Sequence, residues 1–247
     1  MITLAAFYKD CKTDLEISLV PESTKGFNYK KALNCLKETF IKRNPLGKFL
    51  ITTDKETHLK FNESEIFRSD ISHVGLMESL VKSNTHVAKL LMGKIILCGS
   101  DHLVNGDLNK FFIKDFDIGI LYRGDSINNT VVLVNIQDYN RSSIINFFEQ
   151  REQAYYQLPQ DKKNWFGDQL SLQLIMNNHN LFHDNIPMKV SEGIYQGKNL
   201  KFKIMQYGKN EVTGCSKKSG KYNKGSIFID FKGTRKQFFD QIYQELK

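Results

Sequence analysis

The chain has 247 residues, of which 40% are hydrophobic and 12% aromatic, and its formal net charge is +8 at pH 7. This length supports one large domain or two small ones. No apolar run approaches the roughly 20 residues that a membrane-spanning helix needs, which argues against an integral membrane protein. The positive charge favours an anionic partner, such as a sugar nucleotide, a membrane surface or a nucleic acid.

The N-terminus and the cysteines indicate where the protein works. Residues 2–8 read ITLAAFY, which predicts a first strand; the apolar run is short and lacks the basic start of a signal peptide. The four cysteines have no metal-ligand spacing, so we expect free thiols in a reducing compartment. We therefore expect a cytoplasmic protein, with a peripheral position at a membrane surface as the alternative.

Helical and strand patterns alternate along the chain. Residues 27–43 carry Ala32, Leu36 and Phe40 at four-residue steps, which predicts an amphipathic helix. Strands are predicted over 2–8, 48–53, 95–97, 117–123, 131–135 and 227–230, and further helices over 74–81, 142–148 (capped by Ser142 or Ser143), 168–175 and 236–246. Such alternation implies a mostly parallel sheet flanked by helices. With no internal repeat and no low-complexity linker, we expect one α/β domain over 1–247.

Two of these strands carry candidate ligand positions. Ala5 and Ala6 lie in the middle of the first strand, where small side chains either let a flat ligand approach the backbone or allow tight sheet packing. The apolar run 95–97 is typical of a strand buried on both faces, and Asp101 follows it. Ligands of open α/β sheets bind at such strand ends. Asp101 either contacts a ligand there or caps the next turn.

The region around Asp101 resembles the metal-site region of glycosyltransferases with the A-type fold. In that family an apolar strand leads to Asp-x-Asp, then Gly-Asp-Leu, an aromatic pair and a strand reading Asp-Ile-Gly. The matching positions here are Asp101, Gly106-Asp107-Leu108, Phe111-Phe112 and Asp117-Ile118-Gly119. The family's first acidic position falls on Gly99. The resemblance implies that Mn²⁺ or Mg²⁺, hard cations that take oxygen ligands, is held against the diphosphate of a sugar nucleotide.

Two further segments resemble the same family in the expected order. The sequence Asn-Asn-Thr at 128–130 resembles the Asn-x-Gly start of a strand in the family, which implies donor contact at Asn129. Asp168 and Gln169 follow the only Trp; in the family an Asp-Gln pair near a helix start lies over the donor sugar and the acceptor. The alternative is structural, because an Asp in the first helical turn favours the macrodipole and Trp165 suits a core.

The segment 222–233 resembles the C-terminal segment of family 8-like glycosyltransferases, where a strand ends in His-Phe-x-Gly. The His of that motif binds the metal and the following residues hold the diphosphate. Asp230 stands in place of the His, and a carboxylate suits a hard cation. Lys232 and Gly233 suit a phosphate contact, because a point charge lies beside an unhindered backbone N–H. The alternative is a turn with a solvated lysine.

Residues 198–224 carry eight lysines against one acid, Glu211, with aromatic residues between them. Three explanations stay open: contact with an anionic acceptor or a membrane surface, an ordinary solvated surface, or a nucleic-acid groove, which we consider unlikely. The six histidines are scattered, and no H-E-x-x-H pattern joins His179 and His183. We expect all six at the surface or at helix ends.

The resemblance therefore implies an enzyme that transfers a hexose-type sugar from a nucleotide-diphosphate sugar to a glycan or lipid-linked acceptor. Residues 1–130 would hold the nucleotide and residues 131–247 the acceptor. The implied catalytic residues are Asp168 and Gln169, the implied metal ligands are Asp101 and Asp230, and the candidate donor-binding residues are Ala5, Ala6, Tyr8, Asp101, Asn129, Lys232 and Gly233. The alternative is a degenerate module that keeps the fold, lacks an acid at Gly99, and binds a glycan or a nucleic acid without catalysis.

Overall fold

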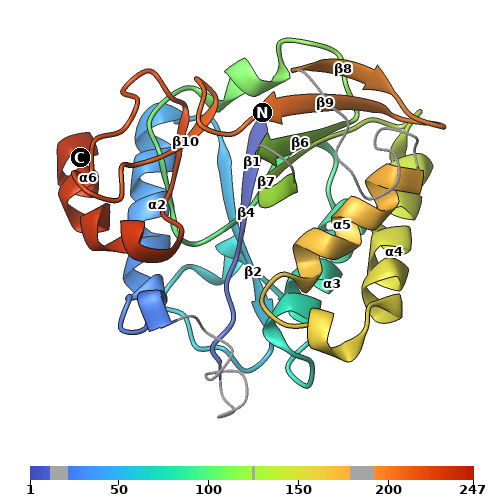
Figure 1. Ribbon diagram of the computed structural model, residues 1–247, viewed down its shortest axis with the longest axis horizontal. Helices are drawn as coiled ribbons and strands as arrows, with labels where there is room; N and C mark the ends of the chain where they lie inside the picture. Colours follow the sequence, from blue (N-terminus) through green and yellow to red (C-terminus); the bar gives the residue numbers. More distant parts are fainter. Residues whose placement is uncertain (12–21, 124–125, 179–191) are drawn as a thin grey trace.

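The computed structural model describes residues 1–11, 22–123, 126–178 and 192–247. A central sheet separates two groups of helices, with α2 and α6 on one side and α3, α4 and α5 on the other (Figure 1). The described part of the sheet has eight strands in the order β3-β2-β1-β4-β7-β6-β9-β8. β7 and β8 pair antiparallel to their neighbours, and the other pairings are parallel. The expected α/β fold with a mixed, mostly parallel sheet is confirmed.

The strands of this sheet are β1 (Ile2–Phe7), β2 (Lys48–Asp54), β3 (Ile66–Ser69), β4 (Gly93–Gly99), β6 (Ile118–Arg123), β7 (Ser126–Ile136), β8 (Gly193–Gln196) and β9 (Lys201–Gln206). A second sheet joins β10 (Val212–Gly214), β11 (Phe228–Asp230) and β5 (His102–Val104), with β11 in the middle. This small sheet brings two distant segments together, because it pairs β5, which follows β4, with β11 in the C-terminal part of the chain.

The helices are α2 (Tyr29–Arg43), α3 (Leu76–Leu90), α4 (Arg141–Gln157), α5 (Gly167–Asn178) and α6 (Phe239–Leu246), and the 3₁₀ turns include η3 (Leu108–Phe112) and η5 (Gly233–Phe238). Two details differ from expectation. Asn140, rather than Ser142 or Ser143, occupies the N-cap of α4. The last predicted helix is divided, because residues 233–238 form a 3₁₀ turn before α6 begins.

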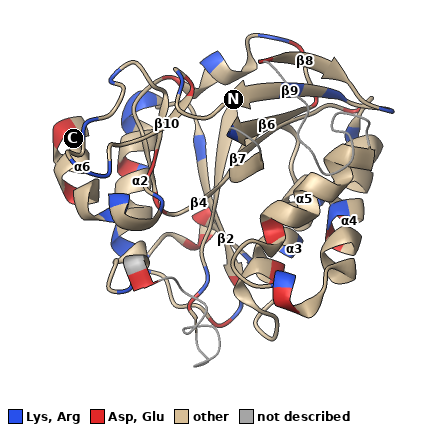
Figure 2. Ribbon diagram, viewed as in Figure 1, with Lys and Arg blue, Asp and Glu red and all other residues tan. Residues whose placement is uncertain are grey.

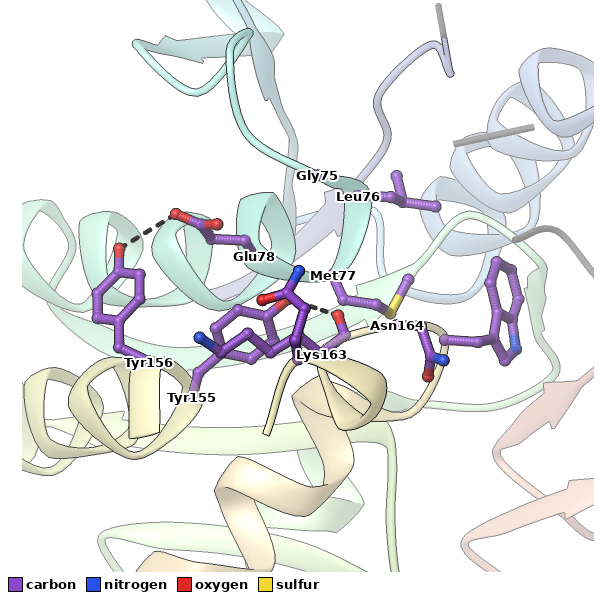
Figure 3. A pocket seen from close by; sticks show the side chains of 10 residues that line it. Gly75, Leu76, Met77, Glu78, Tyr155, Tyr156, Lys163 and Asn164 are labelled. Carbon is purple, nitrogen blue, oxygen red and sulfur yellow. Dashed lines mark hydrogen bonds between the residues drawn. The ribbon is translucent and has the colours of Figure 1, made fainter. Parts of the chain in front are cut away.

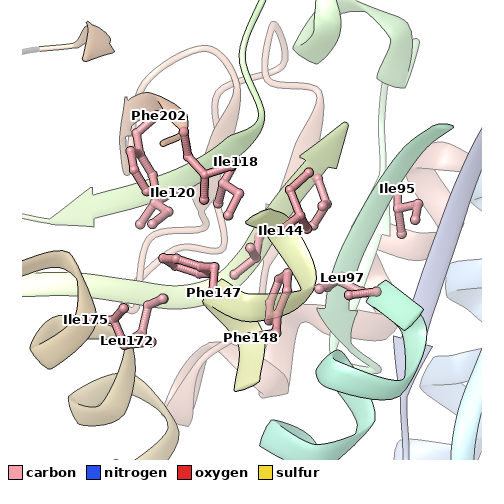
Figure 4. Packing of buried hydrophobic residues seen from close by; sticks show 14 of the residues in the cluster. Ile95, Leu97, Ile118, Ile120, Ile144, Phe147, Phe148, Leu172, Ile175 and Phe202 are labelled. Carbon is pink, nitrogen blue, oxygen red and sulfur yellow. The ribbon is translucent and has the colours of Figure 1, made fainter. Parts of the chain in front are cut away.

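The core follows from the alternation of side chains along the strands. On β4, Ile95 and Leu97 face one cluster of buried apolar residues, whereas Ile96 and Cys98 face the other. The first cluster packs against α4 and α5, where Phe147, Phe148 and Leu172 meet the strands (Figure 4). The second lies under α2. Because both faces of β4 are covered, its sequence reads as a continuous apolar run.

Lysine and arginine residues occur on elements throughout the fold and do not gather on one helix (Figure 2). No helix among the described residues combines the length and apolar character needed to cross a membrane.

Candidate functional site

A cavity of about 490 Å³ opens where β1 and β4 end side by side. The last paired residues of these parallel strands are Phe7 and Gly99, so the residues that follow them emerge at the same edge of the sheet. The cavity is lined by the strand ends (Phe7 to Cys11 and Gly99 to Asp101), the approach to α2 (Thr24 to Phe27 and Tyr29), the start of α3 (Leu76, Met77 and Leu80) and Trp165. It lies where open α/β sheets bind ligands.

A second cavity, of about 460 Å³, adjoins the first. The two share Leu76, Met77 and Trp165 among their lining residues. Tyr155 and Tyr156, at the end of α4, lie opposite the start of α3 (Figure 3). The Tyr155 hydroxyl donates to the Lys163 carbonyl oxygen at 2.6 Å, and the Tyr156 hydroxyl donates to Glu78 at 3.3 Å. One wall of the second cavity is therefore aromatic and held by hydrogen bonds.

Asp101 forms a nearly buried ion pair at the edge of the first cavity. Its Oδ2 lies 2.6 Å from Nζ of Lys236, and the exposed fractions of the two side chains are 20% and 6%. Burial alone would raise the pKa of Asp101, but Lys236 and His102 lower it to about 2. Burial lowers the pKa of Lys236, yet the attraction of Asp101 outweighs it, and the net shift is upward. Both groups therefore stay charged at neutral pH.

His102 lies between the two predicted metal ligands, and it is 2% exposed. Its Nδ1 donates to the Gly99 carbonyl oxygen at 3.1 Å and lies 3.7 Å from Oδ1 of Asp101. Its Nε2 lies 3.4 Å from Oδ1 of Asp230. The expectation that every histidine lies at the surface or at a helix end is wrong for His102, because the pairing of β5 with β11 buries it.

Asp230 is completely buried at the end of β11. Its Oδ2 accepts a hydrogen bond from the Tyr207 hydroxyl at 2.9 Å. Burial raises the pKa of Tyr207, and Asp230 raises it further, so this hydroxyl keeps its proton. Oδ1 of Asp230 and Nε2 of His102 have no hydrogen-bond partner among the described residues. His102 and Asp230 therefore lie close together in the interior, with Nε2 of the imidazole and Oδ1 of the carboxylate facing each other.

The predicted catalytic pair lies at the start of α5. Asp168 is nearly buried, and its Oδ2 accepts from Nδ2 of Asn129 at 2.6 Å. Its backbone carbonyl accepts from the guanidinium of Arg151, an α4 residue with no exposed surface. Burial lowers the pKa of Arg151 to about 10, and Asp168 partly opposes this shift. The structure thus joins Asn129 to Asp168 by a hydrogen bond. Neither Asp168 nor Gln169 lines the two cavities.

Gly167, at the start of the same helix, has a packing role. A Cβ added there would lie 2.8 Å from the Tyr155 ring and 2.9 Å from the Lys162 carbonyl oxygen. Only glycine lets α5 approach α4 this closely, because any larger residue would push the helix start away.

The remaining predicted donor-binding residues are Lys232, Gly233, Tyr8, Ala5 and Ala6. Lys232 donates to Oδ1 of Asn128 at 2.8 Å, and Gly233 has φ +57°, a left-handed conformation that glycine adopts without strain. Tyr8 lines the first cavity and donates to Asp10 at 2.5 Å. Ala5 and Ala6 are buried in the apolar clusters on opposite faces of β1 and line neither cavity. Of the two explanations for these alanines, the structure favours tight sheet packing.

The side chains around Asp101 do not fit a divalent cation well. Gly99 supplies no ligand atom, Oδ2 of Asp101 is taken by an ammonium group, and Asp230 is enclosed by Tyr207 and His102. Among the described residues, no group of three or more His, Cys, Asp and Glu side chains could hold a metal ion. Shared ligation of one cation by Asp101 and Asp230 stays a prediction.

Sequence reasoning missed His102, Tyr207 and Lys236. His102 directly follows Asp101, and Lys236 stands six residues after Asp230, but only the pairing of β5 with β11 brings these segments together. The spacing of apolar residues over 236–246 predicts a terminal helix that begins at Lys236. The turn at Gly233 instead directs it back to Asp101.

Comparisons with known proteins agree on the fold. No protein-family model matches the chain, and no curated protein matches it. The galactosyltransferase LgtC in complex with donor and acceptor sugar analogues is 10% identical, with a TM-score of 0.51 over 99% of this chain and 94% of LgtC. An active-site mutant of LgtC is 11% identical, with a TM-score of 0.52 and the same coverage. The chain therefore has the A-type glycosyltransferase fold over nearly its whole length.

Two further structures are similar. A glycosyltransferase involved in glycosylation of the major capsid of PBCV-1 is 12% identical, with a TM-score of 0.49 over 98% of both chains. The glycosyltransferase GlyE of Streptococcus pneumoniae TIGR4 is 14% identical, with a TM-score of 0.45 over 72% of this chain. This chain spans only 43% of the length of GlyE.

Proposed function

We propose that the chain transfers a sugar from a nucleotide-diphosphate sugar to a glycan or lipid-linked acceptor. The observation that carries the proposal is the cavity at the ends of β1 and β4, which is lined by Asp101, the ion-pair partner of the buried Lys236. It is supported by the fold shared with LgtC, which has been crystallised with donor and acceptor sugar analogues. A fold alone does not define an activity, so the argument depends on the site.

The nucleotide belongs in the first cavity under this proposal. Apart from Trp165, all the residues that line it come from the first 101 positions of the chain, which supports the expected division into a nucleotide half (1–130) and an acceptor half (131–247). Tyr8, Phe27 and Tyr29 offer aromatic faces to a base. The diphosphate lies toward Asp101, whose ion-pair partner is Lys236 of the C-terminal segment.

The sugar lies toward the start of α5 in this arrangement. The free carboxylate oxygen of Asp168 accepts hydrogen bonds from sugar hydroxyls, while its other oxygen is fixed by Asn129. Gln169 lies near the anomeric carbon. Catalysis consists mainly of positioning and of stabilising the departing diphosphate. The second cavity, beyond Trp165, is the candidate place for the acceptor.

A panel of nucleotide-diphosphate sugars tests the activity, with release of nucleoside diphosphate as the measurement. We expect release from at least one donor. Asp168→Asn should lower kcat/KM by the equivalent of about 1.5–3 kcal/mol, and Gln169→Ala by about 0.5–1.5 kcal/mol, the values of a charged and a neutral hydrogen bond. Asp70→Asn is the matched control, because Asp70 is an exposed acid paired with Lys55. If both site variants keep the wild-type kcat/KM, the sugar pocket is misplaced.

The second candidate function is a degenerate module that binds without catalysis, and the absence of a side chain at Gly99 favours it. The same panel decides between the two. A binding module shifts its melting temperature in the presence of a glycan or a nucleic acid but releases no nucleoside diphosphate from any donor.

A further inference from the structure

The place where the resemblance implied a divalent cation is next to a fixed ammonium group. We propose that this chain neutralises the diphosphate of its donor with lysine side chains, Lys236 above all, and that binding of the nucleotide needs no divalent cation. The proposal rests on the proposed function, because it concerns the same donor. It assigns a positioning and charge-neutralising role to a residue that sequence reasoning interpreted as part of a terminal helix.

Asp101 already has a cation as its partner. Nζ of Lys236 lies 2.6 Å from Oδ2 of Asp101, so a divalent ion on that oxygen would have to displace the lysine or lie against a like charge. A second carboxylate could attract the ion strongly enough, but position 99 is glycine. A Cβ added at Gly99 would lie 3.1 Å from Oδ1 of Asp101, so a side chain there would need a small shift of the Asp101 carboxylate.

Lys236 is held in place by more than Asp101. Its ammonium also donates to the Phe231 carbonyl oxygen at 2.9 Å, and it lies 5.4 Å from the ring centroids of both Phe27 and Tyr29. The carbonyl belongs to the residue after Asp230, and both rings line the first cavity. A charge held in this way is preorganised, so little further ordering is needed when an anion arrives.

The segment around Lys236 carries further basic side chains. Lys232, Arg235 and Lys236 lie in or next to the 3₁₀ turn η5, and the carboxylates nearby are Asp101 and Asp230. Lys236 is paired with Asp101, whereas Lys232 and Arg235 donate to a side-chain amide and a backbone carbonyl, so neither of these two charges is offset by an ion pair with the described residues. Asp230 is enclosed, whereas Lys232 is only half-buried and is bonded to a neutral amide. Lys232 is thus free to turn its charge to a diphosphate.

The first experiment needs only the wild-type protein. Binding of UDP, GDP, ADP and CDP is measured by calorimetry in excess EDTA and again in excess MnCl₂ or MgCl₂. We expect at least one nucleotide to bind in EDTA with a Kd within about threefold of its value with metal. Binding that occurs only with metal would overturn the inference and leave the proposed function standing. Absence of binding under every condition would overturn both.

Two variants give opposite results under the two explanations. If Lys236 holds the diphosphate, Lys236→Met should weaken binding in EDTA by about tenfold or more, and Asp101→Asn should tighten it, because it removes the carboxylate that offsets the charge of the lysine. If Asp101 holds a metal, Asp101→Asn should abolish metal-dependent binding instead. Lys48→Met is the matched control. Lys48 is exposed at the start of β2, whereas the cavity lies where the neighbouring parallel strands end, so this variant should bind the nucleotide as the wild type does.

A direct measurement of Mn²⁺ binding to the protein completes the test. The paramagnetic resonance signal of free Mn²⁺ is titrated with the wild-type protein in the absence of nucleotide, and we expect no loss of signal. Uptake of one Mn²⁺ per chain, absent in Asp101→Asn, would overturn the inference. Because neither this titration nor the wild-type calorimetry uses Lys236→Met, the test survives if that variant fails to fold, which circular dichroism would show.

Discussion

Single residues at this site are defined by the charges around them, and Asp101 is the clearest example. Its pKa is about 2 in the folded protein, against an ordinary value of 3.8. A carboxylate with a lowered folded pKa contributes stability above its unfolded pKa and loses that contribution as the pH falls through the folded pKa. The ion pair with Lys236 should therefore stabilise the protein at neutral pH and cease to do so between about pH 4 and pH 2.

Asp101→Asn measures this contribution. We expect the wild-type protein to be more stable than the variant by about 2 kcal/mol at pH 6, with the difference shrinking as the pH approaches 2. Urea unfolding at several pH values, followed by circular dichroism, gives both free energies. A difference that does not change over this pH range would mean that the ion pair does not form in solution.

The thiols provide a residue-scale test of the first cavity. Cys35, Cys98 and Cys215 are buried, and burial raises the pKa of each, to about 11 for Cys35. Cys11 is half-buried and lines the first cavity. Because the thiolate is the reactive form, we expect a maleimide to modify Cys11 first, and a bound nucleoside diphosphate to slow that reaction several-fold. Mass spectrometry after timed labelling identifies the modified residue; preferential labelling of a buried thiol would contradict the arrangement.

At the scale of secondary-structure elements, the sequence predicts what is local. The continuous apolar run of β4 and the four-residue steps of α2 place both elements correctly, because burial of apolar side chains dominates their free energy. The pairing of β5 with β11 is not local, since it joins His102 to Asp230 across more than a hundred residues. Three residues per strand are too few for a periodic signal. The part of the site that includes His102, Tyr207 and Lys236 therefore could not be predicted from the pattern.

The small sheet offers its own test at Gly214, the β10 residue paired with Asp230. A Cβ added there would lie 2.4 Å from the Tyr207 hydroxyl, which is the donor to Asp230. Gly214→Ala should therefore destabilise the fold by about 1–3 kcal/mol through overpacking and loss of that hydrogen bond. Chemical unfolding measures the change.

Gly75→Ala is the control for this measurement, because an added Cβ at Gly75 meets nothing within 4 Å. It should unfold within about 0.5 kcal/mol of the wild type. Equal stability of Gly214→Ala and Gly75→Ala would mean that the Tyr207–Asp230 contact contributes nothing to the fold.

At the scale of the whole molecule, the net charge of +8 is shared among many elements. Within residues 198–224, the charges of Lys201, Lys203 and Lys209 are offset by nearby acids. Lys217, Lys218 and Lys221 are exposed and form no ion pair with the described part of the chain. The basic segment is therefore less basic in the folded protein than its composition implies.

The strength of the predicted peripheral membrane contact can be estimated from these three exposed lysines. A lysine near an anionic membrane contributes about 1 kcal/mol, so three lysines give only weak attraction that salt screens. We expect the protein to sediment with phosphatidylserine-containing vesicles at low ionic strength and to be released near physiological salt. A variant with Lys217, Lys218 and Lys221 all changed to Gln should not sediment, whereas Lys48→Gln should behave as the wild type. Equal sedimentation with neutral phosphatidylcholine vesicles would contradict an electrostatic contact. Retention on single-stranded nucleic acid alone would indicate that these lysines line a nucleic-acid groove instead.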